Sequence, residues 1–360
     1  MDFELTEEQA ALGEVSRSML AVNCPPQRVR TLAKAALEFD DKLWQRGAEL
    51  GWIGLAVPEE LDGAGQGLVE LCLVAEELGR AAAPGAFLDS ALIALVLARH
   101  GRPELAGALA AGELKASWAH HGSVTGSYEG DDLVLAGRAT AVQAAAAADW
   151  LLVTASCAPG SDTGSERGRR LVLVDRPRAR VEPRRTLDET RRWSDVVLDG
   201  VRVAAADVVT ADEAEIQWLT DAGGVLVAAD SLGVGERLLD MTVGYVKVRE
   251  QFGRPLGSFQ SVKLKVADML TTLKGARAAT YYAAMALDAG VADATTASSV
   301  AKAFTTDGVA ALAGEALQAH GGIGFTWEHD LHLYLRRAKV NEMLFGAATE
   351  HYERLASLLE

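Results

Sequence analysis

The chain has 360 residues, of which 49% are hydrophobic and 24% are charged, so it is long enough for two or three globular domains. Asp and Glu outnumber Lys and Arg by 50 to 35, and this acidic balance disfavours a nucleic-acid or anionic-membrane partner. The three cysteines, Cys24, Cys72 and Cys157, have neither CxxC spacing nor a cluster with histidine, so neither a disulfide framework nor a metal site is predicted.

Helical patterns dominate the first part of the chain. Thr6 and Gln9 have the spacing of a capping box ahead of a helix, and an acidic start of this kind indicates no signal peptide. Apolar periods over residues 42–50, 69–78 and 92–100, joined by Gly- and Pro-rich linkers, predict a helical domain. The longest apolar run is far too short to cross a membrane, so we expect a cytoplasmic protein.

The middle and the end of the chain have different patterns. Short β-rich runs with closely spaced turn signals predict strands at 132–135, 149–154, 171–174 and 196–203. Long helical periods follow at 224–250, 261–287, 294–320 and 338–359. Antiparallel helices of that length form a bundle, which often oligomerises through a remaining apolar face. We therefore expect an α+β fold with a helical domain (1–112), a β-domain (113–210) and a helical bundle (211–360).

The stretch from residue 245 to 269, YVKVREQFGRPLGSFQSVKLKVADM, joins the first two helices of this bundle. Gly253 and Pro255 cannot both continue a helix, so a turn presents a set of polar side chains together: Arg249, Arg254, Gln251 and Gln260. A planar guanidinium group binds phosphate oxygens bidentately, which favours a phosphate-binding role for the turn. Taken alone, the same residues also fit a solvated corner between two helices.

This stretch resembles, through the pattern RxQFGxxLxxFQxxxxxxADM, the signature turn of the acyl-CoA dehydrogenase family, flavoenzymes that desaturate acyl-CoA thioesters. LTEEQ near the N-terminus and the helix-ending QAHGGIG extend the resemblance over most of the chain. The resemblance implies a helical N-terminal domain, a small middle β-barrel and a C-terminal four-helix bundle, with FAD as cofactor. The FAD-binding positions that it implies are Arg249, Gln251, Phe252, Gln260, Gln318, Gly321, Gly322 and Gly324.

The places where the family performs its chemistry are altered. Family members usually hold the catalytic glutamate directly before a glycine, shortly after an Arg-Asp-Ala-Lys motif; here that residue is Phe345, which cannot accept a proton. The alternative position on the first bundle helix is Gly223, followed by Gly224 where many members have arginine. We therefore assign no catalytic residue. The nearest acids are interpreted as helix-surface or capping charges: Asp221, Asp230, Glu342 and Glu350.

The β-domain shows a similar loss. Residues 119–127, AHHGSVTGS, lack the acid and the proline of the family loop that hydrogen-bonds the flavin ring and the thioester. The alanine-rich residues 137–145 cannot supply the hydrogen-bond donors that a flavin needs. We interpret His120 and His121 as a solvated pair rather than as metal ligands.

Three hypotheses remain open. In the first, the chain pairs with a homologous, catalytically complete subunit, as in heteromeric family members from actinobacteria that handle steroid-derived acyl-CoAs; the pair shares FAD, oxidises an acyl-CoA and passes electrons to an electron-transfer flavoprotein. In the second, the chain is a self-sufficient homo-oligomeric dehydrogenase whose base has moved to Asp221 or Glu342. In the third, it is a scaffold that has lost flavin. The sequence does not specify the acyl-CoA.

Overall fold

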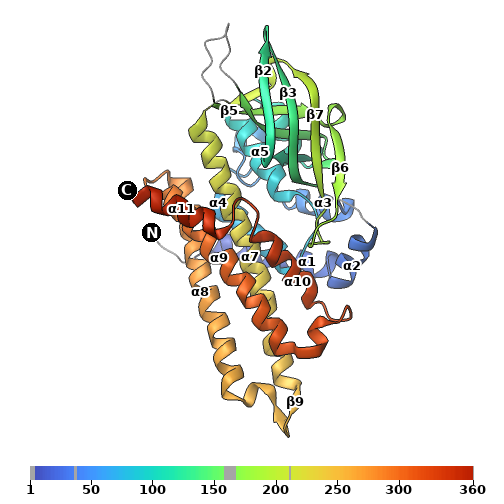
Figure 1. Ribbon diagram of the computed structural model, residues 1–360, viewed down its shortest axis with the longest axis vertical. Coiled ribbons are helices and arrows are strands. Elements are labelled where there is room, and N and C mark those ends of the chain that lie inside the picture. Colours follow the sequence, from blue (N-terminus) through green and yellow to red (C-terminus); the bar gives the residue numbers. More distant parts are fainter. Residues whose placement is uncertain (1–4, 36–38, 158–167, 211, 360) are drawn as a thin grey trace.

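The computed structural model describes residues 5–35, 39–157, 168–210 and 212–359, and its helical, β and helical parts confirm the predicted α+β fold (Figure 1). The helices of the first part are α1 (Glu7–Asn23), α2 (Pro26–Ala35), α3 (Asp41–Glu49), α4 (Leu68–Arg80), α5 (Phe87–Arg99) and α6 (Pro103–Ala110). At the start of α1 the Gln9 N–H donates to the Thr6 hydroxyl (3.2 Å), and the Thr6 N–H donates to the Gln9 side chain (3.0 Å). The predicted capping box is thus confirmed.

The middle part is a sheet of eight strands in the described residues. They are β1 (Ala116–Ala119), β2 (Gly122–Glu129), β3 (Asp132–Gln143), β4 (Trp150–Cys157), β5 (Gly168–Asp175), β6 (Arg180–Arg184), β7 (Trp193–Val203) and β8 (Val208–Thr210). The order across the sheet is β6-β7-β3-β2-β4-β5-β8, with β1 on β4. Neighbours run antiparallel except that β4 is parallel to β1 and β2. The sheet encloses an apolar core of its own.

The C-terminal part is a bundle that extends away from the sheet (Figure 1). Its elements are α7 (Glu213–Val248), the strands β9 (Glu250–Gln251) and β10 (Arg254–Pro255), α8 (Gln260–Ala289), α9 (Ala294–His320), α10 (Leu331–Asn341) and α11 (Ala348–Leu359). No helix in the described part of the chain combines the length and the apolar character that a membrane crossing requires.

The predicted fourth bundle helix, 338–359, is wrong. The chain forms α10 and α11 with a break between them, because Phe345 and Gly346 adopt positive φ angles of 55° and 99°. Lys302 and His351 donate hydrogen bonds to carbonyl groups of this break, and these contacts replace the hydrogen bonds that a helix would make. The apolar period in the sequence runs through the break and so conceals it.

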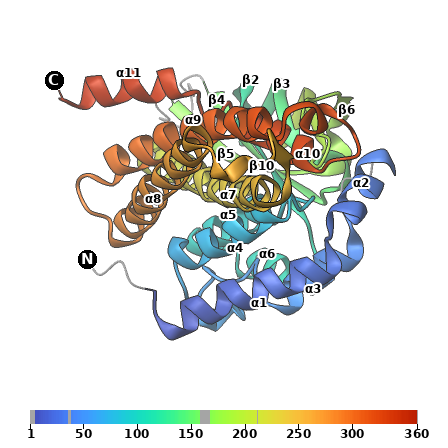
Figure 2. The ribbon, with the colours of Figure 1, turned by 90° about the horizontal axis from the view of Figure 1, so that it is seen from below.

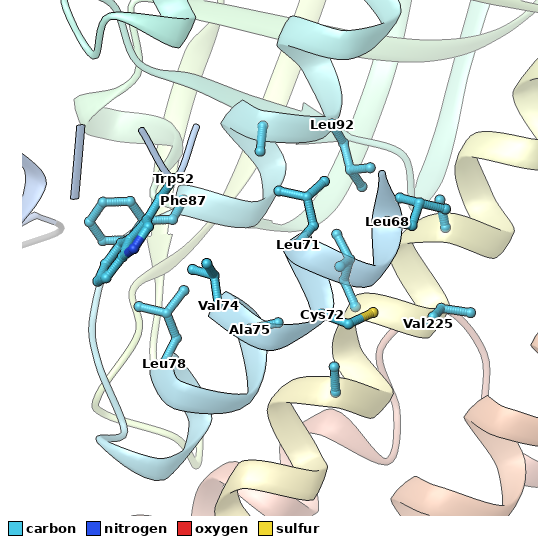
Figure 3. Close-up of a cluster of buried hydrophobic side chains, with 14 of the residues drawn as sticks. Trp52, Leu68, Leu71, Cys72, Val74, Ala75, Leu78, Phe87, Leu92 and Val225 are labelled. Atoms are coloured by element: carbon cyan, nitrogen blue, oxygen red, sulfur yellow. The ribbon is translucent and has the colours of Figure 1, made fainter. Parts of the chain in front are cut away.

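The N-terminal core is centred on α4 and α5. Figure 3 shows Leu71 and Leu78 of α4 in one cluster with Phe87 and Leu92 of α5 and Val225 of α7. These side chains are almost completely buried, and each contributes roughly 1.5–3 kcal/mol. The cluster therefore fixes the first helices against the bundle.

A buried ionic network connects all three parts of the chain. Arg337 of α10 donates to the Asp230 carboxylate of α7 from Nε (3.0 Å) and Nη2 (2.6 Å), and to the Ala83 carbonyl (2.8 Å). Asn341 donates to Asp230 (2.7 Å) and accepts from Arg191 of the β-domain (2.6 Å). Burial alone would raise the pKa of Asp230, but the Arg337 and Arg191 guanidinium groups outweigh it and hold that pKa below its usual value. Asp230 is therefore a buried ion-pair partner, which corrects its interpretation as a surface or capping charge.

Candidate functional site

At the far tip of the bundle, the chain passes from α7 to α8 through a short hairpin (Figure 1). β9 and β10 pair antiparallel, and the two turn residues, Phe252 and Gly253, have φ angles of 53° and 75°. Two successive positive φ angles are typical of a type I′ turn, which suits glycine and is unfavourable for phenylalanine. Phe252 is also 92% exposed. The hairpin therefore holds an aromatic ring out into solvent.

A groove of about 640 Å³ lies beside this hairpin, where the end of α7, the start of α8 and the end of α9 meet. Figure 2 views the molecule from this end of the bundle. The groove brings together these predicted FAD-binding positions: Arg249, Gln251, Gln318, Gly321 and Gly322. The signature turn and QAHGGIG are thus distant in sequence but form one surface.

The remaining predicted positions lie close to the groove but do not line it. Phe252 is at the tip of the hairpin, and Gln260 is the exposed first residue of α8. Gly324 is buried, and a β-carbon there would stand 3.0 Å from Leu317 Cδ1. Its lack of a side chain therefore lets the turn after α9 pack against that helix.

The polar groups of the groove suit an anionic, nucleotide-like ligand. The Arg249 guanidinium is exposed and has neither an ion pair nor a hydrogen-bond partner within the described residues. Gly321 has φ 61° and ψ −140°, a conformation that is essentially restricted to glycine. A β-carbon on Gly321 or Gly322 would meet nothing within 4 Å, so there is open space beside both backbones. A free guanidinium group and an accessible backbone fit the ADP portion of a flavin nucleotide.

Sequence reasoning missed other residues of this groove. Lys265 forms an ion pair with Glu315 at its edge. The His320 ring stacks on Tyr245 with 4.6 Å between ring centroids, and His320 Nδ1 lies 2.7 Å from the Ala316 carbonyl oxygen. His320 stands inside the QAHGGIG motif and Lys265 inside the signature stretch, so their positions within the motifs were the available signal.

A second cavity, the junction cavity, lies where the three parts of the chain meet. Its free volume is about 50 Å³, and it is lined by apolar side chains from α4, α5 and α7 together with Asp89, His120, Arg191 and Phe345. Gly223 also lines it, so the two residues at the family's usual base positions, Phe345 and Gly223, are brought together. A β-carbon built on Gly223 would stand 2.4 Å from the Phe345 ring.

An aromatic cluster closes this cavity. The Phe345 and His120 rings stack with a centroid distance of 4.3 Å and an interplanar angle of 7°, and Trp118 lies 5.6 Å from Phe345. Burial lowers the pKa of His120 to about 4, with a smaller contribution from His121. The interpretation of this histidine pair as solvated is therefore wrong for His120, although His121 is exposed. A neutral, stacked imidazole contributes to packing here.

The two candidate relocated bases are engaged elsewhere. Asp221 is 3% exposed, and its carboxylate accepts two hydrogen bonds from Arg354, at 2.6 and 2.9 Å. Glu342 pairs with Lys339 at 3.0 Å. Neither carboxylate lines the junction cavity. Asp221 is thus buried in an ion pair, which corrects its interpretation as a surface or capping charge.

Two carboxylates line the junction cavity: Asp230, which is held in the buried network, and Asp89 of α5, which sequence reasoning missed. Asp89 accepts a hydrogen bond from the Trp118 N–H (3.2 Å), and burial raises its pKa to about 6. Its signal in the sequence is a lone acid in the otherwise apolar run FLDSALIALVL. The cavity has a free volume of only about 50 Å³, so Asp89 has little free space in front of it.

Comparison with known proteins defines the class of protein. Residues 6–111 match the family model for the acyl-CoA dehydrogenase N-terminal domain, and residues 215–357 match the model for the acyl-CoA dehydrogenase C-terminal domain. The chain belongs to the acyl-CoA dehydrogenase family, as its resemblance implied. The helical domain, central sheet and bundle described above are the fold of that family.

Several individual proteins are similar to the chain over nearly its whole length. The acyl-CoA dehydrogenase IpdE2 of Mycolicibacterium smegmatis is 32% identical over 98% of each chain. The ChsE4-ChsE5 complex from Mycobacterium tuberculosis has a TM-score of 0.91 and 30% identity, covering 100% of this chain and 99% of that one. The Tcur3481-Tcur3483 steroid ACAD G363A variant has a TM-score of 0.89 and 29% identity over 98% of each chain. The first of these solved structures is described as a complex, and the name of the second joins two proteins.

Proposed function

We propose that this chain is the base-lacking subunit of a hetero-oligomeric acyl-CoA dehydrogenase in the cytoplasm. A homologous partner subunit supplies the catalytic carboxylate, and the two chains bind FAD between them. FAD held between the two chains would supply a hydride acceptor for the β-carbon of an acyl-CoA, and the partner's carboxylate would take the α-proton, so that the product would be the 2-enoyl-CoA. The electrons then leave to an electron-transfer flavoprotein. The names of the ChsE4-ChsE5 and Tcur3481-Tcur3483 structures support a paired assembly and, for the second, a steroid-derived substrate.

The observation that carries this proposal is the contrast between the groove and the junction cavity. The groove keeps an Arg249 guanidinium that no other described residue pairs with, and accessible backbone at Gly321 and Gly322. The junction cavity has Phe345 and Gly223 at the base positions and is filled by an aromatic ring. A chain of this kind can hold one end of the cofactor for chemistry performed in another subunit.

The distribution of exposed apolar side chains supports a partner on the bundle. Most of the large apolar side chains that stand exposed in the described residues belong to the C-terminal part, and several of them lie on α7, α8 and α9 or in the segments that follow α7 and α9: Val248, Phe252, Leu264, Leu270, Val300, Phe304, Ile323, Phe325 and Trp327. Apolar surface gathered in this way marks protein interaction sites. In this assignment Gln251 and Gln318 contact the nucleotide, while Phe252 and Gln260 contact it at the interface and Gly324 shapes the turn beside it.

The proposal is tested by co-expressing the chain with a homologue that has an intact base. We expect a yellow complex that bleaches when an acyl-CoA is added, whereas the chain alone is colourless or insoluble. In the complex, Arg249→Ala should lower the flavin content at least about tenfold, which corresponds to about 1.4 kcal/mol of lost binding. Arg46→Ala is the matched control, because Arg46 is exposed on α3 and pairs only with Glu49.

The possible results separate the three hypotheses. A chain that is yellow on its own and bleaches with acyl-CoA would establish the self-sufficient dehydrogenase. Flavin content that is unchanged by Arg249→Ala would favour the scaffold, because the groove would then hold no cofactor.

A further inference from the structure

Phe345 lies between two cavities of the chain. One is the junction cavity, and the other is a cleft of about 190 Å³ between the start of α7 and α11, which we call the α11 cleft. Phe345 is the one described residue that lines both. Its ring meets Gly223 on the junction side, whereas its β-carbon lies 3.8 Å from a β-carbon built on Gly224 on the cleft side. The side chain therefore stands between the two cavities.

The backbone that carries this ring is strained and held in place. Phe345 has φ 55°, a conformation that is unfavourable for a bulky residue. Lys302 of α9 is fully buried, and its ammonium group donates to the carbonyls of Gly346 (2.9 Å) and Glu342 (3.3 Å). His351 of α11 lies 3.0 Å from the Phe345 carbonyl oxygen through Nε2. The carbonyl oxygens on both sides of the ring are thus fixed by two side chains from different helices.

The contacts of Lys302 are those of a residue that positions a loop. Its other hydrogen bond goes to the Thr306 hydroxyl (3.2 Å), and no carboxylate forms an ion pair with it among the described residues. Burial lowers the pKa of Lys302 to about 8. A buried ammonium group without its acceptors is costly, so opening of the loop would leave Lys302 unsatisfied.

We propose that Phe345 is a plug that closes the passage between the α11 cleft and the junction cavity, and that Lys302 and His351 hold it shut. The wall behind the plug has an apolar part, formed by side chains such as Leu88, Leu92 and Leu226, and this part would take a flat apolar molecule if the ring were absent. The proposal rests on the proposed function, because it makes this subunit unable to admit an acyl group at its own junction. Its test uses neither flavin nor activity, so the two can fail separately.

The plug is tested with indole as a probe on the full-length chain, in an experiment that needs neither partner nor flavin. Phe345→Gly removes the ring and relieves the strained φ angle, and Phe345→Ala removes the ring alone. We expect both variants to bind indole at least about tenfold more tightly than the natural chain, measured by calorimetry with the natural chain as reference. Phe345→Met, which refills the space with a flexible side chain, should bind no better than the natural chain. Folded Gly and Ala variants that gain no affinity would overturn the proposal.

The positioning role is tested by hydrogen exchange, which needs no change at Phe345. Lys302→Met removes the donor to the two carbonyls, and we expect the amides of residues 342–347 to exchange at least about tenfold faster. Lys302→Arg should restore part of the protection. Lys339→Met is the matched control, since Lys339 is exposed and pairs only with Glu342. Equal amide exchange in the Lys302→Met and Lys339→Met variants would show that Lys302 does not hold the loop closed.

Discussion

The ring of Phe345 occupies the space where a side chain on Gly223 would lie, with a β-carbon at Gly223 only 2.4 Å from Cε1 and 2.6 Å from Cζ. Gly223→Ala should therefore destabilise the chain by about 1–3 kcal/mol, because the ring must move within a closely packed cluster. Gly244→Ala on the same helix is the control: a β-carbon there meets nothing, so alanine should be neutral or stabilising by up to about 1 kcal/mol. Urea unfolding of both variants measures the difference, and equal stabilities would mean that the ring moves freely.

The pair of Arg337 and Asp230 predicts a large loss of stability when one partner is removed. Arg337→Met leaves a buried carboxylate without its counter-ion, so we expect a loss of about 3–5 kcal/mol in the free energy of unfolding. Arg46→Met breaks a pair whose side chains are 60% and 61% exposed, and it should change stability by less than about 1 kcal/mol. Chemical denaturation of the two variants compares buried and exposed pairs within one protein. A similar small effect in both would show that water enters the network.

His120 predicts a loss of stability in acid. Its pKa in the folded chain is about 4 because of burial, compared with 6.5 in an exposed histidine, so the unfolded chain binds the proton more tightly. The contribution of His120 is therefore complete above pH 6.5 and decreases as the pH falls towards 4. Between pH 7 and pH 5 we expect the natural chain to lose roughly 2 kcal/mol more than His120→Phe does.

Unfolding free energies of both chains at the two pH values measure this difference. His121→Phe is the control, because His121 is exposed and directly follows His120 in the chain. If His121→Phe and His120→Phe showed the same acid response, the effect would come from other groups.

At the hairpin tip, a substitution of Phe252 should affect the stability of the chain and its binding to a partner differently. Asparagine tolerates positive φ angles better than phenylalanine, so Phe252→Asn should leave the stability of the chain unchanged or raise it by up to about 1 kcal/mol. The same change removes a ring that is 92% exposed, so we expect less partner and less flavin in the purified complex. Thermal unfolding of the chain and the absorbance ratio of the complex give the two measurements. A complex with its full flavin content would exclude the ring from the interface.

Much of the fold follows from local patterns in the sequence. Apolar spacing located α4, α5, α8 and α9 to within a few residues, and the capping box at Thr6 is a purely local feature. The break between α10 and α11 could not be found in this way, because it depends on Lys302, which is 44 residues away from Gly346. Local spacing carries no information about such a contact.

The sequence likewise predicted one part of the candidate site and missed another. The groove residues belong to two motifs whose joint presence predicts a common surface, and the structure brings five of the eight predicted positions onto it. The burial of Asp230 was missed, because an acid in a helix looks the same whether it faces water or an arginine 107 residues away. The stacking of His120 on Phe345 was missed because these residues are far apart in the sequence. Only the packing of three parts of the chain decides between these states.

The buried network around Asp230 also determines how the chain melts. Since Arg337 contacts Asp230 of α7 and the Ala83 carbonyl, while Asn341 accepts from Arg191, no part can detach without leaving a charge or a polar group behind in an apolar interior. Heating should therefore produce a single calorimetric transition, with the sheet and both helical parts losing their order at the same temperature.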